Sequence, residues 1–269
     1  MSLKVTVLGS GTSHGVPMIG CECAVCQSTD PRDRRTRPSI LLELDGVPAD
    51  ASGSATATSV RSILVDTSTD LRFQALAQRV ARVDAILFTH SHADHIFGLD
   101  EVRRFNIIQR SAIPFYADAQ TLADVQRAFA YIFAPGTAVG GGIPQLVPFR
   151  LGGPFSLGGQ EIVPVPLWHG QRPILGFRIG RFAYLTDCNA IPETSWPLLE
   201  GVELLIVDAL RRKKHPTHFN VDEAIAVVER LRPQRAWFTH ICHDLGHAET
   251  CASLPSGVEL AYDGMLLSV

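Results

Sequence analysis

The amino-acid sequence predicts an α/β sandwich formed by one domain over residues 1–269. Short apolar runs suited to buried strands recur through the chain and alternate with Gly and Pro. Helical periodicity occurs in fewer places, and hydrophobic residues make up 46% of the chain, as is ordinary for a globular core. No linker rich in Pro, Gly or Ser divides the 269 residues, so we expect one domain rather than two.

The expected elements follow from these patterns in chain order. Strands are expected over 3–8, 39–44, 61–66, 83–89, 113–117, 160–167, 175–179, 182–186, 203–208 and 235–239. Helices are expected over 70–81, 96–108, 121–129 and 221–231, and Asn220 is a candidate N-cap for the last of them. The tract 48–59, rich in Ala, Ser and Thr, predicts an exposed hairpin excursion.

Charge and hydropathy narrow the class of protein. The net charge of −3 gives no general affinity for nucleic acid. No apolar run is long enough to span a bilayer, and the chain opens on a strand-like segment rather than a signal peptide. We therefore expect a cytoplasmic protein with neither a membrane nor a nucleic acid as its partner.

The segment His90-Ser91-His92-Ala93-Asp94-His95 packs three imidazoles and a carboxylate into six residues. Both groups are ligands that Zn²⁺, Mn²⁺ and Fe²⁺ accept. Neighbouring side chains splay apart in an extended turn, so His90 and His92 can reach one ion while Asp94 and His95 reach another. An apolar run expected to form a strand precedes the cluster, and it would give the turn a rigid mount. The pattern predicts a two-metal site.

Three later strand ends carry further candidate ligands: His169, Asp187 and His240. A lone His or Asp after a strand is more often a turn or capping residue than a ligand. Beside the six-residue cluster, however, they predict three additional ligands for the same site.

The cysteines suggest a separate metal site. Cys21, Cys23 and Cys26 place three thiols within six residues, and a long chain without a signal sequence favours metal ligands over disulfides. A structural Zn²⁺ is usually tetrahedral, so we expect a histidine from elsewhere as the fourth ligand. Cys188, Cys242 and Cys251 lie apart in the sequence and are expected to be small core residues.

The order His-x-His-x-Asp-His, then His, Asp and His, resembles the metallo-β-lactamase superfamily. The resemblance covers almost the whole chain and implies a four-layer αββα sandwich with two metals at one edge of the facing sheets. It implies the following ligands: His90, His92 and His169 for the first metal, Asp94, His95 and His240 for the second, and Asp187 bridging both.

More specific motifs are similar to those of the PhnP-like phosphodiesterases. They are Gly15-Val16-Pro17, the Gly20-Cys21-Glu22-Cys23-x-x-Cys26 run, His240-Ile241-Cys242-His243 and the closing Tyr262-Asp263-Gly264-Met265. This resemblance implies a structural zinc held by Cys21, Cys23, Cys26 and His243.

The predicted function is a metal-dependent hydrolase. Two divalent ions, Zn or Mn, would lower the pKa of a shared water, and the resulting bridging hydroxide would attack a small cyclic phosphate or nucleotide-like phosphodiester. Asp94 would orient the hydroxide or manage its proton. His218 matches a PhnP-type histidine opposite the metals and is the candidate acid for the leaving group. The non-catalytic alternative is a solvent-facing histidine near the start of a helix. His14, His215, His247 and the basic run Arg211–Lys214 have no assigned role.

Alternatives stay open at this point. A two-metal centre of this kind can also hydrolyse a lactam or a thioester. The lactam alternative is disfavoured because β-lactamases generally lack the bridging carboxylate. A tRNA-processing nuclease is disfavoured by the acidic balance, and a non-catalytic nucleotide-binding protein by the complete ligand set. The sequence leaves the physiological substrate, the metal and the oligomeric state open, a homodimer included.

Overall fold

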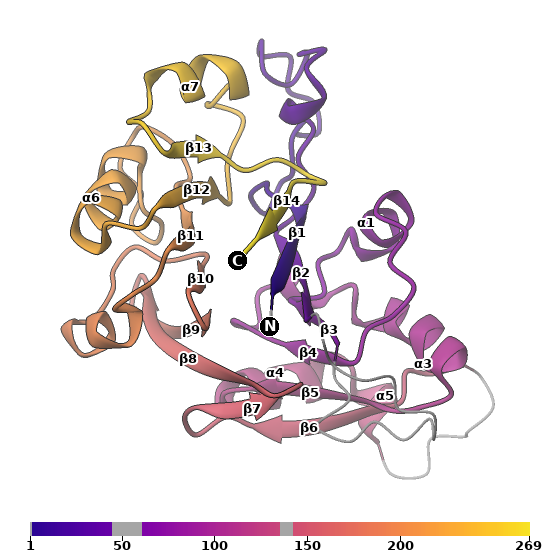
Figure 1. The fold of residues 1–269 in the computed structure, drawn as a ribbon. Coiled ribbons are helices and arrows are strands. Elements are labelled where there is room, and N and C mark those ends of the chain that lie inside the picture. The colour runs from indigo at the N-terminus through magenta and orange to yellow at the C-terminus, as the bar shows by residue number, and fades with distance from the viewer. Residues whose placement is uncertain (1, 45–60, 135–141) are drawn as a thin grey trace.

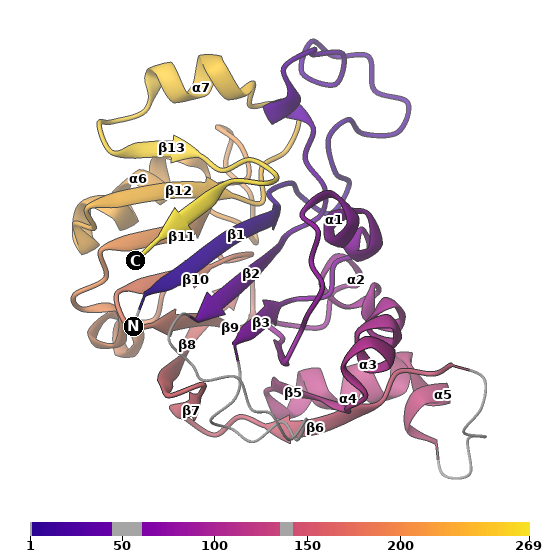
Figure 2. The ribbon, with the colours of Figure 1, turned by 45° about the vertical axis from the view of Figure 1, so that its right-hand side comes forward.

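Two seven-stranded sheets face each other and carry helices on their outer sides (Figures 1 and 2). The structure is a computed structural model that describes residues 2–44, 61–134 and 142–269. The exposed hairpin predicted at 48–59 lies outside these ranges. None of the helices in the described ranges is long and apolar enough to cross a bilayer.

The first sheet has the strand order β14-β1-β2-β3-β4-β5-β6. Its strands along the chain are β1 Leu3–Gly9, β2 Ser39–Leu44, β3 Ser62–Val65, β4 Ala85–Leu87, β5 Ile113–Ala117, β6 Leu146–Arg150 and β14 Leu266–Ser268. Strands β14, β1, β2 and β3 pair in antiparallel fashion, whereas β3 to β6 are parallel. The carboxyl ends of β3 and β4 therefore lie at the same edge.

The second sheet has the order β13-β12-β11-β10-β9-β8-β7. Its strands are β7 Phe155–Leu157, β8 Gln160–His169, β9 Arg172–Ile179, β10 Phe182–Leu185, β11 Leu204–Asp208, β12 Arg235–Thr239 and β13 Val258–Leu260. Strands β10 to β13 are parallel, and β9 runs antiparallel to both of its neighbours. As a result, β8, β10, β11 and β12 all end at one edge.

Alternating side chains produce the layers. In β2, Ile40 and Leu42 pack between the two sheets, while Leu41 packs against the helices outside the first sheet. In β11, Ile206 points to the inter-sheet core and Val207 to the helices outside the second sheet. Because side chains in a strand alternate between faces, each sheet buries both of its faces. The predicted αββα sandwich is confirmed.

The helices complete the outer layers. Outside the first sheet lie α1 Leu71–Ala77, α2 Ala93–Ile96, α3 Arg103–Gln109, α4 Ala119–Ala128 and α5 Ala130–Phe133; outside the second lie α6 Val221–Leu231 and α7 His247–Ser253. Three 3-10 turns are η1 Pro31–Asp33, η2 Leu99–Val102 and η3 Glu193–Leu199. Asn220 caps α6 as predicted: its Oδ1 accepts from Glu223 N at 2.8 Å, and Glu223 Oε2 accepts from Asn220 N at 3.0 Å.

The helix predicted over 96–108 is wrong as a single element. It is three pieces, α2, η2 and α3, with a break at Gly98. A Cβ at Gly98 would collide with the carbonyl oxygen of Ser68, so close packing against that backbone sets the break. The helix predicted over 70–81 also stops early, at Ala77, and Arg79 adopts a left-handed φ of 52°.

Candidate dinuclear metal centre

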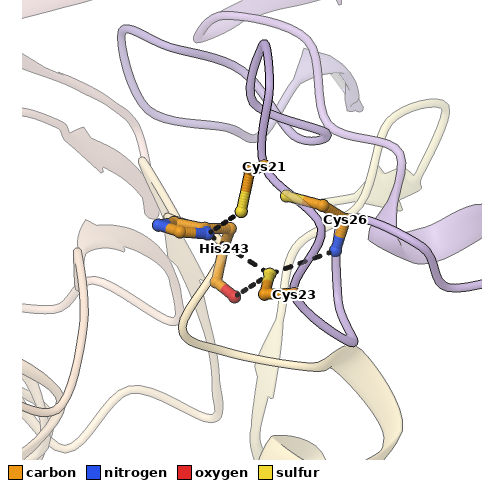
Figure 3. Close-up of side chains that lie close together, drawn as sticks. All are labelled: Cys21, Cys23, Cys26 and His243. Carbon is orange, nitrogen blue, oxygen red and sulfur yellow. Dashed lines mark hydrogen bonds between the residues drawn. The ribbon is translucent and has the colours of Figure 1, made fainter.

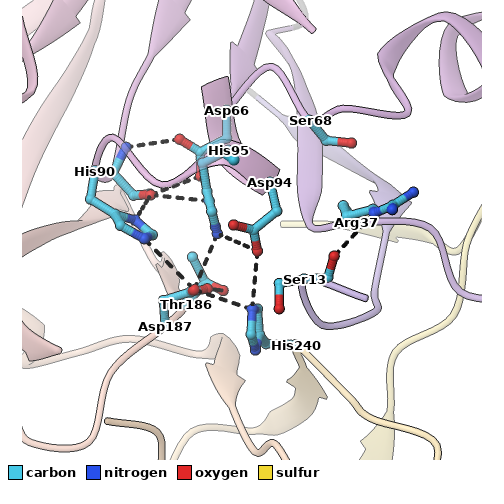
Figure 4. Close-up of polar contacts among 12 residues, drawn as sticks. Ser13, Arg37, Asp66, Ser68, His90, Asp94, His95, Thr186, Asp187 and His240 are labelled. Carbon is cyan, nitrogen blue, oxygen red and sulfur yellow. Dashed lines mark hydrogen bonds and ion pairs between the residues drawn. The ribbon is translucent and has the colours of Figure 1, made fainter. Parts of the chain in front are cut away.

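The edges where β4, β8, β10 and β12 end bring the predicted ligands together. His90 follows β4 of the first sheet, whereas His169, Asp187 and His240 stand at or just after the ends of β8, β10 and β12 of the second. Parallel strands end at a common edge, which is why residues far apart in the sequence converge here. Figure 4 shows His90, His95 and His240 pointing toward Asp187.

The first ligand group consists of His90, His92 and His169. One ligand atom from each lies within 4.8 Å of the others. The ring centroid of His92 is 4.5 Å from that of His90 and 4.9 Å from that of His169. The structure therefore brings these three predicted ligands together.

The second ligand group consists of Asp94, His95, Asp187 and His240, all buried. Asp187 Oδ2 lies 3.1 Å from the Nε2 atoms of both His95 and His240, and 3.8 Å from Nε2 of His90 in the first group. Asp187 therefore stands between the two groups, in the position expected of a bridging carboxylate.

The chemistry of these atoms fits divalent metal ions. The Nε2 atoms of His90, His95 and His240 are buried and make no aligned hydrogen bond within the described part of the chain. Buried polar atoms normally have a partner, so three such nitrogens facing one carboxylate point to a ligand. Imidazole with carboxylate is a donor set that Zn²⁺ and Mn²⁺ both accept.

A residue not singled out in the sequence, Asp66, orients two of the ligands. It follows β3, and its Oδ2 lies 2.7 Å from His95 Nδ1 and accepts from Thr89 Oγ1 at 2.8 Å. Thr89 Oγ1 in turn lies 3.0 Å from His90 Nδ1. With Nδ1 engaged, each ring presents Nε2 to the centre. An acidic residue directly after a strand, at the edge that carries the ligands, is the signal that could have identified it.

The backbone is strained at three of these positions. Asp66, Asp187 and His240 have φ values of 63°, 59° and 58°, in the left-handed region that residues other than glycine rarely adopt. Such strain concentrates at functional sites, where surrounding structure enforces it. In each case the unusual turn comes directly after a strand, or one residue beyond it.

The electrostatics differ between the two groups. Burial lowers the pKa of His90 well below its usual value and that of His169 to about 4. In the second group burial also opposes protonation of His240, but Asp187 outweighs it and raises the pKa of His240 to about 10. The pKa of His95 is likewise raised, while the pKa of Asp187 stays low despite burial because His240 and His95 surround it.

His218 lies against both groups and is buried rather than solvent-facing. Its Nδ1 is 2.7 Å from Oδ2 of Asp208, the fully buried last residue of β11. Its ring stacks on that of His240 at 4.5 Å and meets that of His169 at 4.7 Å. The remaining ring nitrogen, Nε2, is the one that the Asp208 contact leaves for a ligand or substrate.

A cavity of about 260 Å³ adjoins His218. Its walls come from three segments: the glycine-containing loop with Thr12 to Gly15 and Met18, the loop with Leu210, Arg211 and His215, and Cys242 to Asp244. The loop with Thr12 to Gly15 therefore lies near the candidate centre. His14 and His215 line this cavity, whereas His247 is buried at the start of α7.

The cysteine cluster forms a second candidate metal site (Figure 3). The sulfur atoms of Cys21 and Cys23 lie 3.2 and 3.3 Å from His243 Nδ1, and Cys26 completes a group whose ligand atoms are all within 4.8 Å of one another. Donation by the Cys26 backbone N–H, together with His243, lowers the pKa of Cys23 to about 6. Three thiols and an imidazole in this arrangement match the Cys₃His donor set of structural zinc.

The other cysteines lie outside both groups. Cys188 and Cys242 are buried, as expected of core residues. Cys251 lies within α7 and is only half-buried, and its sulfur accepts from Leu260 N of β13 at 3.3 Å.

Comparison with known proteins places this geometry in a family. Residues 61–241 match the family model of the beta-lactamase superfamily domain. A solved structure described as a new diphosphatase from the PhnP family is 42% identical, with a TM-score of 0.89, and the match covers 100% of this chain and 98% of that one. Zn²⁺-bound PqqB from Methylobacterium extorquens shares the fold at 20% identity and a TM-score of 0.77, covering 98% and 99% of the two chains.

A curated relative adds a different name. The octanoyltransferase of Porphyromonas gingivalis is 34% identical over 265 residues, which are 98% of this chain but 51% of that protein. The chain thus spans about half the length of this relative. By its family match, its fold and its PhnP-type relative, the chain belongs to the metallo-β-lactamase superfamily and is PhnP-like.

Proposed function

We propose that the protein hydrolyses a small phosphodiester or cyclic phosphate. The observation that carries the proposal is the Asp208–His218 pair, which lies beside both ligand groups. An alkoxide leaving phosphorus requires a proton or a cation, and an imidazole held by a buried carboxylate can supply it. His218 is therefore the proposed general acid.

Two divalent ions fit the donor atoms of the centre. The first would be held by His90, His92 and His169, the second by Asp94, His95 and His240, and both by Asp187. When bound, such a pair of ions lowers the pKa of a water molecule and neutralises charge on the oxygens of the group under attack.

Asp94 has a second role in this proposal. Its Oδ2 lies 3.5 Å from His95 Nε2 and 3.6 Å from His240 Nε2. Neighbouring His95 and His240 keep its pKa low despite burial, so the carboxylate is ionised. An ionised carboxylate accepts hydrogen bonds, and Asp94 would thus orient the attacking water and receive its proton.

The cavity beside His218 would take the departing part of the substrate. Its volume of about 260 Å³ is below the roughly 300–1,000 Å³ typical of drug-sized ligands, which favours a small molecule over a nucleic acid. Arg211, His14 and His215 line the cavity, and Asp244 is the one carboxylate among its lining residues. This excess of basic side chains over acidic ones suits a polar or anionic group.

The relative at 42% identity supports phosphoryl chemistry, since that protein is described as a diphosphatase. The test is turnover of bis(p-nitrophenyl) phosphate, a nucleoside 2′,3′-cyclic phosphate and a nucleoside diphosphate sugar after reconstitution with Mn²⁺ or Zn²⁺. We expect hydrolysis of at least one of them. Metal-loaded, folded protein that hydrolyses none would contradict the proposal.

A second candidate is hydrolysis of a thioester, which the name of the octanoyltransferase relative favours. An acyl thioester assayed by release of free thiol, with nitrocefin as the lactam probe, separates the two reactions. Faster turnover of the thioester than of every phosphodiester would replace the proposed function, and ligand binding without any turnover would favour a binding protein.

A further inference from the structure

Both candidate metal sites draw a ligand from one short segment. His240 belongs to the dinuclear centre and His243 to the cysteine cluster, only three positions later. Residues 241–246 form neither a helix nor a strand, and their only β-type pairing within the described ranges is the isolated bridge between Ile241 and Gly11. Their position must come from contacts with other parts of the chain.

A buried arginine supplies several of those contacts, beside the backbone hydrogen bonds that Ile241 N donates to Ser10 O and Cys242 N donates to Leu210 O. Arg35 Nη1 donates to the carbonyl oxygen of Cys242 at 3.1 Å, and Nη2 donates to that of Leu245 at 2.7 Å. Nη2 also donates to Asp33 Oδ1 at 2.8 Å, and this carboxylate accepts the backbone N–H of His247 at 2.8 Å. The segment is thus held at both ends by one ion pair.

The same arginine anchors the loop that leads to the cysteines. The backbone N–H and carbonyl groups of Arg35 and Val16 exchange two hydrogen bonds of 2.8 Å. Thr12 N in turn donates to Ile241 O at 3.1 Å. The loop with Thr12 to Gly15 and the segment Cys242 to Asp244 are two walls of the cavity beside His218. Arg35 therefore contacts the segments that carry ligands of both metal sites and that line the cavity.

The energetics make this contact hard to replace. The Arg35 side chain is 0% exposed, and burial lowers its pKa although Asp33 counters the effect. Removing this buried charged donor leaves the carbonyls of Cys242 and Leu245 without that partner and the Asp33 carboxylate without its counter-charge, and that loss is larger than for an exposed pair. An ammonium lacks the planar fork of a guanidinium, so lysine cannot make the same set of bonds.

We propose that Arg35 is a positioning residue through which the Cys21/Cys23/Cys26/His243 site sets the geometry of His240. Metal binding at the cysteine site then does more than hold its own loop in place. It also determines the metal affinity of the dinuclear centre. The inference rests on the assignment of both groups as metal sites, which the proposed function also uses, but not on any substrate.

The test is a double-mutant cycle on Mn²⁺ affinity. A single equivalent of Zn²⁺, which thiolates prefer, is first loaded into the intact cysteine site. It is omitted from the Cys21→Ser variants, where it would enter the His/Asp groups instead. Mn²⁺, which prefers nitrogen and oxygen ligands to thiolates, then reports on the His/Asp groups. Cys21→Ser, Arg35→Lys and the double variant are each titrated with Mn²⁺ by calorimetry or electron paramagnetic resonance. We expect each single change to weaken Mn²⁺ binding by about tenfold, the scale of residues that orient metal ligands, and the double change to add little.

The matched control is Arg178→Lys. Arg178 also donates to backbone carbonyls, those of Gly180 and Leu198, but these lie outside both metal groups. It should leave the Mn²⁺ affinity unchanged. If Arg35→Lys does not fold by circular dichroism, Asp33→Asn takes its place in the cycle.

Folded Cys21→Ser protein with wild-type Mn²⁺ affinity would overturn the inference, as would losses that simply add in the double variant. Because the readout is metal binding, it is independent of whether the substrate is a phosphodiester. A wrong proposed function would leave these titrations unchanged.

Discussion

The two ligand groups of the candidate dinuclear centre differ in the protonation of their histidines. The first group is three histidines, and the pKa values of His90, His92 and His169 are all lowered, chiefly by burial. The second group mixes two carboxylates with two histidines whose pKa values are raised by those carboxylates. Without metal, the imidazoles of the first group are neutral near pH 7. The imidazoles of the second group are protonated, and their positive charge offsets that of the two carboxylates.

The difference implies an order of loading. A metal ion needs deprotonated ligands, so it can enter the first group without displacing protons at neutral pH. In the second group it must displace protons from His95 or His240, and it gains the attraction of two carboxylates. We therefore expect metal binding at the first group to change little with pH near neutrality, and metal binding at the second group to strengthen as the pH rises.

Loss of the carboxylate between the groups should have the largest effect. Asp187→Ala removes the atom that faces both groups, and we expect a loss of metal affinity exceeding about a hundredfold at each, together with loss of hydrolysis. Metal content after dialysis and turnover of bis(p-nitrophenyl) phosphate are the measurements. A variant that still retains both ions would show that the two groups do not share Asp187.

His218→Ala separates chemistry from metal binding. We expect kcat to fall by about 10²- to 10⁴-fold, the usual contribution of a general acid, while both ions stay bound. His215→Ala, a cavity histidine 5.1 Å away between ring centroids, is the matched control and should change KM more than kcat. An unchanged kcat for His218→Ala would remove it from the mechanism.

Asp66→Asn should weaken both groups, and the second more strongly. Asp66 contacts His95 directly but reaches His90 only through Thr89, so we expect about a 10- to 100-fold loss of affinity in the second group and a smaller loss in the first. Titrating the variant with Mn²⁺ should resolve two affinities. Equal losses would show that Asp66 acts on the fold rather than on His95.

The pH dependence of metal binding should differ between the groups. His240 has a pKa raised to about 10, so it is protonated below that pH, and affinity at the second group should rise by about tenfold per pH unit for each proton displaced. His169, with a pKa lowered to about 4, is already neutral above pH 5, so the first group should be nearly flat from pH 6 to 8. Titrating His169→Ala with metal isolates the second group, and titrating His240→Ala isolates the first. Equal slopes of affinity against pH in the two variants would contradict the difference in protonation between the groups.

Asp124→Asn should give the smallest effect, confined to the first group. Asp124 Oδ2 accepts from Ser91 Oγ at 2.6 Å and from Arg172 Nη2 at 3.0 Å. These contacts join the turn that carries His90 and His92 to the hairpin that carries His169. We expect a loss of a few-fold in first-group affinity, measured in the His240→Ala background, and no loss in the second group.

The sequence could predict the ligands because their chemistry is visible in residue type. Three imidazoles and a carboxylate between His90 and His95 suit little besides metal binding, and their partners follow strands that hydrophobic patterns identify. Asp66 and Asp208 also stand at strand ends, but that position alone does not reveal their roles, because a single acidic residue at or just after a strand end is common in turns. Only the fold reveals that both lie behind a histidine.

Other features could not be predicted because they depend on packing between distant segments. Gly98 interrupts a helical pattern through contact with Ser68, thirty positions earlier, which periodicity does not record. The short strands β13 and β14 span three residues each and give too weak an alternating pattern to identify. The role of Arg35 likewise depends on carbonyl groups more than two hundred positions away.

Asp263 ties the loop after β1 to a segment more than two hundred positions later in the chain. Its carboxylate accepts the backbone N–H and hydroxyl groups of Ser10 and Thr36 at 2.6–2.9 Å, and β14 behind it pairs with β1. The loop that begins at Ser10 thus lacks its anchor until a ribosome has made residue 263, and contacts of such long sequence separation form slowly. Both candidate metal sites likewise draw on distant parts of the chain, and they are complete only once His240 and His243 have been synthesised.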